Sequence, residues 1–203
     1  MTAGRQINTL TQSRCTPEKY VQAVKHFFWW EIDLDPCSNE YSIVGAKIEY
    51  ILPEKNWLID SRNFNRIYVN PPYWLDKANW TSIKHWIKRC HMANSEHWSE
   101  VIALIPVATN TSHRKEYIFW QADWVCFLAD TRLKFLVNGE YVEKWAPMAC
   151  CIIYWGKKIE RFEEIFKEYW ATIKLDNLKD IEWKSPDIKN KIKLIPKNIF
   201  ELA

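Results

Sequence analysis

Ile67-Tyr68-Val69-Asn70-Pro71-Pro72-Tyr73-Trp74 is the stretch around which we expect the fold to be organised. Its first three residues favour a β-strand, and the proline pair cannot continue a hydrogen-bonded ladder, so the strand ends there. A residue before proline is held extended, so Asn70 projects from the strand's end. The Asn70 amide oxygen and the Pro71 carbonyl are then two acceptors for one planar amino group, with the Tyr73 ring stacked behind it. The stretch predicts a site for an aromatic or amide NH2 group; the alternative is a proline-rich turn with an aromatic core side chain.

The composition is that of a folded, globular chain. Of the 203 residues, 48% are hydrophobic and 13 are Trp, which excludes a disordered chain. The length suits a single domain over residues 1–203. The net charge of +3 permits nucleic-acid binding through a local basic face without requiring it.

The cysteines do not follow a metal-binding or disulfide pattern. There are six, with no C-x-x-C pair and no Cys/His cluster of zinc-like spacing, so we expect no metal site. The N-terminus is polar, and no run approaches the ~20 apolar residues of a membrane span. We therefore expect a cytoplasmic protein.

Strands and helices on both sides of the central motif predict an α/β fold. We expect a helix over residues 16–28, with Thr16 as its N-cap and Pro17 in its first turn, and then a strand over 31–35. A helix over 76–93 and a wholly apolar strand over 101–107 complete a βαβ unit with the central strand. Such units make parallel sheets, so the predicted fold is a doubly wound, mostly parallel sheet.

The later part of the chain predicts antiparallel additions. A buried strand is expected over 124–128, a last core strand over 150–155, and a helix over 159–170. Asn138-Gly139 separates segments 132–137 and 140–145, which is a strong hairpin signal. We expect residues 1–15 to form a loose arm and residues 171–203 to wrap the surface as a C-terminal extension.

Two carboxylates accompany the first expected strand. Asp33 and Asp35 lead into the turn-forming residues Pro36, Cys37 and Ser38. Ligands of open α/β sheets bind at the carboxyl ends of the strands, so these side chains are candidate ligand contacts. The alternative is a solvated loop.

In this order, the motifs resemble those of the phage-type DNA N-6-adenine methyltransferase family. The resemblance covers residues 16–156, and its motifs are listed here: Thr16-Pro17, Asp33-Leu34-Asp35-Pro36-Cys37-Ser38-Asn39, Asn70-Pro71-Pro72-Tyr73, Ile102-Ala103-Leu104-Ile105-Pro106 and Arg132-Leu133-Lys134-Phe135. It implies the methyltransferase version of the doubly wound sheet, S-adenosylmethionine (AdoMet) as cofactor, and DNA as partner.

The resemblance also implies roles for individual residues. Asp35, with Pro36, Cys37 and Ser38, would hold the methionine part of AdoMet, with the Asp35 carboxylate near the cofactor's ammonium group. Thr16 and Pro17 would touch the same part, and Asn56 would lie by the cofactor's adenine or ribose. Asp33 and Asn70 are further candidate cofactor contacts. One departure is clear: a glycine-rich loop usually follows the first strand of AdoMet enzymes, whereas this chain has Ser38-Asn39-Glu40.

The implied reaction is direct methyl transfer to adenine N6. The catalytic set would be Asn70, Pro71, Pro72 and Tyr73, which hold and orient an amino group whose lone pair is delocalised into the ring. N6 is paired inside a duplex, so the base must be flipped out at a cost of a few kcal/mol, and stacking on Tyr73 (about 1–3 kcal/mol) offsets that cost.

Several residues are candidate DNA contacts: Trp74 beside the motif, His113, Arg114 and Lys115 in the loop after the strand over 101–107, and Arg132 and Lys134 in the hairpin. Two other functions remain open from the sequence. One is an N-methyltransferase that acts on protein glutamine or on an RNA base, and the other is a nucleic-acid-binding relative without catalysis.

Overall fold

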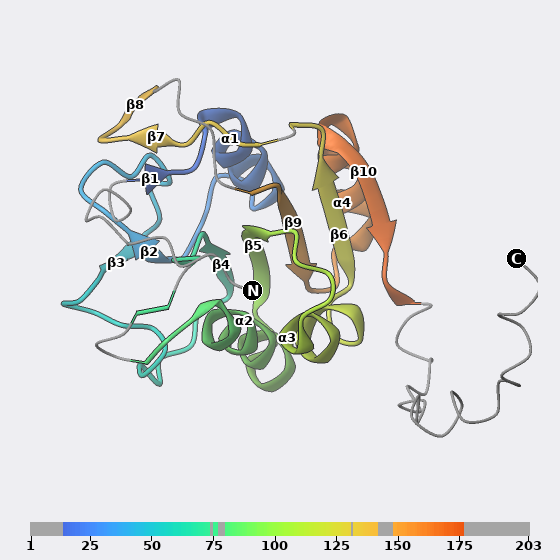
Figure 1. The fold of residues 1–203 in the computed structure, drawn as a ribbon, viewed down its shortest axis with the longest axis horizontal. Coiled ribbons are helices and arrows are strands. Elements are labelled where there is room, and N and C mark those ends of the chain that lie inside the picture. Colours follow the sequence, from blue (N-terminus) through green and yellow to red (C-terminus); the bar gives the residue numbers. More distant parts are fainter. Residues whose placement is uncertain (1–13, 74, 77–79, 131, 142–147, 177–203) are drawn as a thin grey trace, which may run out of the picture.

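The computed structural model describes residues 14–73, 75–76, 80–130, 132–141 and 148–176. A seven-stranded sheet forms the centre of the molecule, in the order β10-β6-β9-β5-β4-β2-β3 (Figure 1). The bounds of its strands are β2 Leu34–Ser38, β3 Ile48–Ile51, β4 Arg66–Val69, β5 Glu100–Pro106, β6 Trp124–Leu128, β9 Cys150–Trp155 and β10 Trp170–Lys174. Strands β2, β3, β4 and β5 are parallel, whereas β9 is antiparallel to both β5 and β6. The expected mixed α/β architecture with a mostly parallel sheet is confirmed.

The central strand is where the sequence predicts it. β4 ends at Val69, and Asn70 follows directly. The helix that connects it to β5 is α2 (Ile83–His97), which begins later than the expected residue 76. Asp76 pairs with Thr81 in an isolated bridge, and the Ser82 N–H donates to His85 Nδ1 at 3.0 Å, which fixes the start of the helix.

Helices cover both faces of the sheet (Figure 1). One apolar cluster joins α1 (Glu18–Phe27) and α4 (Ile159–Phe166) to the face that carries Tyr68 and Ile102. A second cluster joins α2 and a π-helical turn (Lys115–Phe119), which follows the short α3 (Ser112–Arg114), to the face that carries Ile67 and Val101. Neighbouring residues of one strand thus enter opposite cores, as the pleat requires.

The first strand differs from the prediction. It runs over Leu34–Ser38 and not over 31–35, so Asp35, Pro36 and Cys37 lie within the sheet. Its pairing with β3 shifts register between Asp35 and Ser38, and such a bulge is where a sheet tolerates proline. The start of α1 differs too: Pro17 is its N-cap, and Thr16 turns its hydroxyl toward the sheet.

A small three-stranded sheet lies beside the main one, at the upper left of Figure 1. It contains the expected hairpin, as β7 (Leu136–Val137) and β8 (Glu140–Tyr141), and adds β1 (Arg14–Cys15) antiparallel to β7. Residues 14 and 15 of the expected arm therefore form a strand. Residues 1–13 lie outside the described residues, as do residues 142–145 of the expected hairpin.

The C-terminal extension was partly mispredicted. The helix over 159–170 ends at Phe166 and continues as a 3-10 turn (Lys167–Tyr169). Strand β10 then pairs antiparallel with β6, where a surface-wrapping segment was expected. Most of its side chains are exposed, so this edge strand lacks the alternation that marks a half-buried strand. Residues 177–203 lie outside the described residues.

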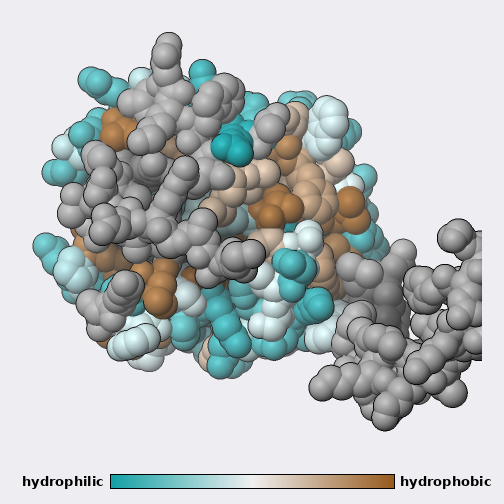
Figure 2. All heavy atoms as spheres, viewed as in Figure 1, coloured by the Kyte–Doolittle hydropathy of each residue, from teal (hydrophilic) through white to brown (hydrophobic). Residues whose placement is uncertain are grey.

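The surface mixes polar and apolar side chains. Figure 2 shows apolar residues over the part of the face where Figure 1 draws β5, β9 and β6, bordered by hydrophilic ones. None of the helices in the described ranges is long and apolar enough to cross a membrane.

Candidate active site

A pocket lies where β2 and β4 end. It encloses about 260 Å³, including its opening to solvent. Its lining comes from β1, β2, the segment after β2, and β4: Cys15, Thr16, Asp35, Cys37, Ser38, Asn39, Ser42, Ile43, Val44, Tyr68 and Asn70. The fold thus brings together five predicted site residues from three distant segments: Thr16, Asp35, Cys37, Ser38 and Asn70.

Asp35 is the pocket's buried charge. Its side chain is 3% exposed, and the backbone N–H of Cys37 donates to Oδ1 at 3.0 Å. Burial raises the pKa of Asp35 to about 7; the Cys37 bond opposes the shift and the neighbouring Glu49 adds to it. None of the salt bridges among the described residues involves Asp35. A buried carboxylate that lacks a cationic partner and faces a pocket is suited to a ligand's ammonium group.

Glu49 is a second carboxylate beside the pocket, and the sequence analysis missed it. It pairs in register with Asp35 across β2 and β3, and its Oε2 accepts a hydrogen bond from Ser38 Oγ at 2.9 Å. Its Oε1 accepts from the Ala46 N–H at 3.2 Å. The parallel pairing of β2 with β3 could have pointed to it, but the strand over residues 43–52 has no clear boundaries in the sequence.

Asn70 is held by hydrogen bonds on both sides of its amide. Its Nδ2 donates to Thr16 Oγ1 at 3.1 Å, and the Thr16 hydroxyl lies 2.7 Å from the buried Tyr68 hydroxyl. On the other side, the Tyr73 hydroxyl donates to Asn70 Oδ1 at 3.1 Å. These bonds fix which way the amide faces. Oδ1 keeps a second lone pair that can accept another hydrogen bond.

The Tyr73 ring is tucked against the core. Its hydroxyl lies 3.2 Å from the Leu104 carbonyl oxygen, and the ring packs edge-on against Phe135 at a centroid distance of 6.2 Å. Burial raises the pKa of Tyr73 well above its usual value. Pro71 is buried and Pro72 half-buried. The predicted stacking of Tyr73 on a base would require the ring to turn outward.

Two predicted cofactor contacts lie elsewhere. Asp33 precedes β2, at the opposite end of the strand, where it accepts hydrogen bonds from Arg66 Nε at 3.1 Å and Lys47 Nζ at 3.1 Å. Burial raises the pKa of Asp33, but these two cations outweigh it and the net pKa is lowered. The assignment of Asp33 to the cofactor site was therefore wrong, because its carboxylate is used in an ion-pair network.

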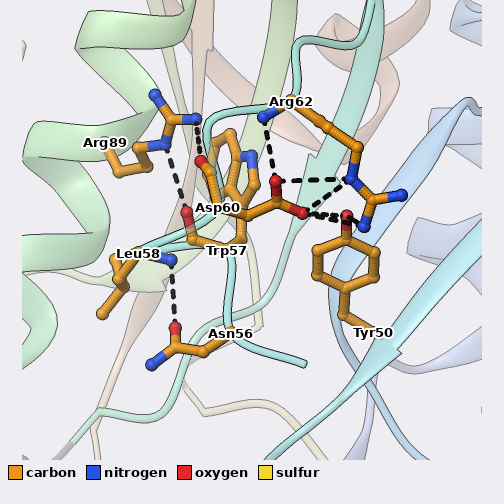
Figure 3. Close-up of polar contacts among 7 residues, drawn as sticks. All are labelled: Tyr50, Asn56, Trp57, Leu58, Asp60, Arg62 and Arg89. Carbon is orange, nitrogen blue, oxygen red and sulfur yellow. Dashed lines mark hydrogen bonds and ion pairs between the residues drawn. The ribbon is translucent and has the colours of Figure 1, made fainter. Parts of the chain in front are cut away.

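Asn56 has a local role. Its Oδ1 accepts from the Leu58 N–H at 3.0 Å, which forms a tight turn (Figure 3). Arg89 of α2 anchors this loop by donating to the carbonyl oxygen of Asp60 at 2.9 Å, while the Asp60 carboxylate joins Arg62 and Tyr50. Asn56 is not among the pocket residues, and neither are Pro17 and Pro36.

The predicted DNA contacts divide into two groups. Arg114 is 1% exposed and donates to the Pro106 carbonyl oxygen and to Cys151 Sγ, each at 3.0 Å, so the expectation that it reaches phosphate was wrong. His113 is half-buried; burial, then Lys84 and Arg114, lower its pKa. Arg132 and Lys134 are exposed on either side of buried Leu133, but they precede β7, which begins only at Leu136, so they lie outside the strand that was expected to carry them. Lys115 is half-buried, and Trp74 lies outside the described residues.

No group of three or more potential metal ligands occurs in the described part of the chain. The pocket combines a buried carboxylate with a fixed amide at the carboxyl ends of neighbouring parallel strands. This is where open α/β sheets bind their ligands.

The fold and the pocket together define an α/β protein that is consistent with a methyltransferase-like architecture. A family model described as DNA N-6-adenine-methyltransferase (Dam) matches residues 8–184. The chain belongs to this family, which supports methyltransferase activity on DNA. No curated protein and no solved structure matches the chain.

Proposed function

We propose that this protein methylates the exocyclic N6 amino group of adenine in DNA, with AdoMet as methyl donor. The observation that carries the proposal is the bond between Asn70 and Thr16, which places a fixed amide acceptor at the rim of a pocket that contains a buried carboxylate. Family membership independently supports DNA adenine as the substrate.

The chemistry of the pocket fits the amino-acid end of AdoMet. The Asp35 carboxylate would hold its ammonium group, since a charge-assisted hydrogen bond offsets the cost of burying the carboxylate. Cys37, Ser38 and Thr16 line the same space. When bound, AdoMet supplies an electrophilic methyl group.

Asn70 would hold the target amine. Its Oδ1 has one lone pair left beside the Tyr73 bond, and it follows β4 directly, where the Pro71 carbonyl can supply a second acceptor. Two acceptors on one NH2 group orient it and draw its hydrogens away from the ring plane, which localises the nitrogen lone pair. Positioning and fixed dipoles thus provide the rate enhancement, without a covalent enzyme intermediate.

The flipped base and its flanking phosphates require a surface beside Asn70. The segment of Phe135, which packs on Tyr73, also carries exposed Arg132 and Lys134. These cations can contact the backbone next to a base that has left the stack.

Incubating adenine-containing duplex DNA with the protein and methyl-labelled AdoMet, then digesting the DNA to nucleosides, tests the proposal. We expect the label in N6-methyldeoxyadenosine. Label in RNA or protein substrates but not in DNA would favour the other N-methyltransferase function, and no AdoMet binding by calorimetry would favour a non-catalytic binding protein.

A further inference from the structure

A row of alternating aromatic rings and cations lies outside the candidate active site. Lys157 Nζ lies 4.1 Å from the ring centroid of Trp98, and the next residue, Lys158, places its Nζ 4.7 Å from that of Trp29. The Arg161 guanidinium lies 3.9 Å from the same Trp29 ring. These contacts form two groups that neighbouring Lys157 and Lys158 connect along the chain, and we call these five residues together with Trp30 the tryptophan–lysine row.

The row lies by the amino ends of the parallel strands, whereas the pocket lies by their carboxyl ends. Trp29 and Trp30 precede β2, and Trp98 precedes β5, so all three lie by the amino ends of parallel strands. Lys157 and Lys158 follow β9, which is antiparallel to β5, and therefore lie at the same edge. Asn70 is at the other end of β4, so the row does not belong to the site described above.

The backbone of the three tryptophans is unusual. Trp29, Trp30 and Trp98 have φ angles of 51°, 65° and 60°, in the left-handed region that favours Gly or Asn. Their side chains are also exposed, by 52%, 66% and 72%. A large aromatic side chain at such a position carries a backbone cost of about 1–2 kcal/mol that burial does not recover in this structure. All three residues follow the ends of helices, where this conformation is common: Trp98 caps α2, and the Trp29 and Trp30 N–H groups donate to carbonyl oxygens of α1. The exposure of the three rings is therefore the feature that a bound partner would explain.

The charge of the row indicates the partner's sign. Lys157, Lys158 and Arg161 take no part in the salt bridges of the described residues. The Arg161 guanidinium does donate to the carbonyl oxygens of Phe27 and His26, so the two lysines are the cations available to a partner. The nearby carboxylates are engaged: Glu31 pairs with Arg66 and Lys47, while Glu100 accepts from the Tyr154 hydroxyl. The row is thus a cationic surface that displays indole rings.

We propose that the tryptophan–lysine row binds single-stranded nucleic acid, separately from the methyl-transfer site. Phosphates would pair with Lys157 and Lys158, and unpaired bases would stack on the exposed indoles, which uses both features of the row. An acidic peptide would use only the cations. The chain's own end segments, 1–13 and 177–203, carry more Lys and Arg than Asp and Glu, so they do not complement the charge.

The test is binding of a fluorescent oligothymidylate of about 20 nucleotides, which contains no adenine and so does not present the proposed target base. We expect Trp30→Ala/Trp98→Ala to weaken binding at least tenfold, since each stacked base contributes about 1–3 kcal/mol. Lys157→Ala/Lys158→Ala should lower the slope of log K against log salt by up to ~1.4. Trp170→Ala is the control. It removes an exposed indole that pairs with Leu128 at the carboxyl end of β6, away from the row, and it should leave binding unchanged.

Methylation of a short adenine-containing duplex should be unaltered in these variants, which also shows that they fold. Unchanged oligothymidylate affinity in both double variants would overturn the proposal. So would equal competition by polyglutamate, which would identify an acidic-peptide site. Sedimentation measures whether the protein is a dimer. If the unmodified protein were a dimer and Trp30→Ala/Trp98→Ala a monomer with the same oligothymidylate affinity, the row would be a self-association surface instead.

Discussion

Thr16 Oγ1 accepts a hydrogen bond from Asn70 Nδ2 at 3.1 Å, across 54 residues of sequence. The bond joins the wall of the Asp35 pocket to the amide that follows the central strand. It turns Asn70 Oδ1 away from Thr16, and the orientation of that oxygen decides whether it can accept from a target amine.

Thr16→Val keeps the shape of the side chain but removes this acceptor and leaves Nδ2 of Asn70 unpaired. An unsatisfied buried polar group costs about 1–3 kcal/mol, so we expect kcat for DNA methylation to fall roughly 5- to 150-fold. Thr16→Ser keeps the hydroxyl and should retain most activity. If Thr16→Val and Thr16→Ser had the same kcat, the bond would have no role in positioning Asn70.

Asp35→Asn should weaken AdoMet binding by tenfold or more at pH 7.5, since a charge-assisted bond of about 1.5–3 kcal/mol is lost. The ionised carboxylate binds the ammonium group and the pKa of Asp35 is raised to about 7, so the affinity of the unmodified protein should rise about tenfold per pH unit up to pH 7. Calorimetry from pH 5.5 to 8 measures both effects. The same rise in Asp35→Asn would assign the titration to another group.

Asp35 should also make the free protein less stable as pH rises. Its folded pKa of about 7 lies above the unfolded value of ~3.9, so the folded state retains a proton that the unfolded state has released between these values. The stabilisation that the Asp35 carboxyl contributes is fully present below pH 4 and is lost as the pH rises through 7. This loss lowers the free energy of unfolding by up to about 4 kcal/mol. Asp35→Asn should therefore have a higher Tm than the unmodified protein at pH 8, with a smaller difference at pH 5. An equal Tm difference at both pH values would show that Asp35 does not titrate in this window.

Arg132→Ala/Lys134→Ala should weaken DNA binding irrespective of sequence. Two lost phosphate contacts would reduce the log–log salt slope by up to ~1.8 in duplex DNA, with AdoMet affinity unaltered. Arg114→Ala is the matched comparison: its buried bonds to Pro106 and Cys151 mean that it should lower Tm without changing the slope. A slope that changes only in Arg114→Ala would move the DNA surface to the loop after β5.

Local sequence signals predicted the elements that they determine. The central strand, the apolar run of β5 and the Asn138-Gly139 hairpin all lie where expected, because proline, continuous apolar residues and a two-residue turn act over a few positions. Within the site, the candidate residues Thr16, Asp35 and Asn70 line one pocket, and their roles toward cofactor and base stay predictions.

The errors concern properties that depend on distant partners. The different environments of Asp33 and Asp35 follow from Arg66, which contacts Asp33 and not Asp35, and from a bulge that carries β2 through Pro36. Arg114 looks like a surface cation in the sequence, but the fold places it under β5 and β9. Glu49 enters the site only through strand pairing. Such tertiary contacts are not encoded in local periodicity.

The central claim is that Asn70 holds the amine that receives the methyl group, and single-turnover formation of N6-methyladenine by Asn70→Ala tests it most directly. The account predicts that this variant loses nearly all turnover while its AdoMet affinity stays within a few fold of the unmodified protein, and that Asn70→Asp keeps part of the rate. Near-normal turnover in Asn70→Ala would contradict the claim.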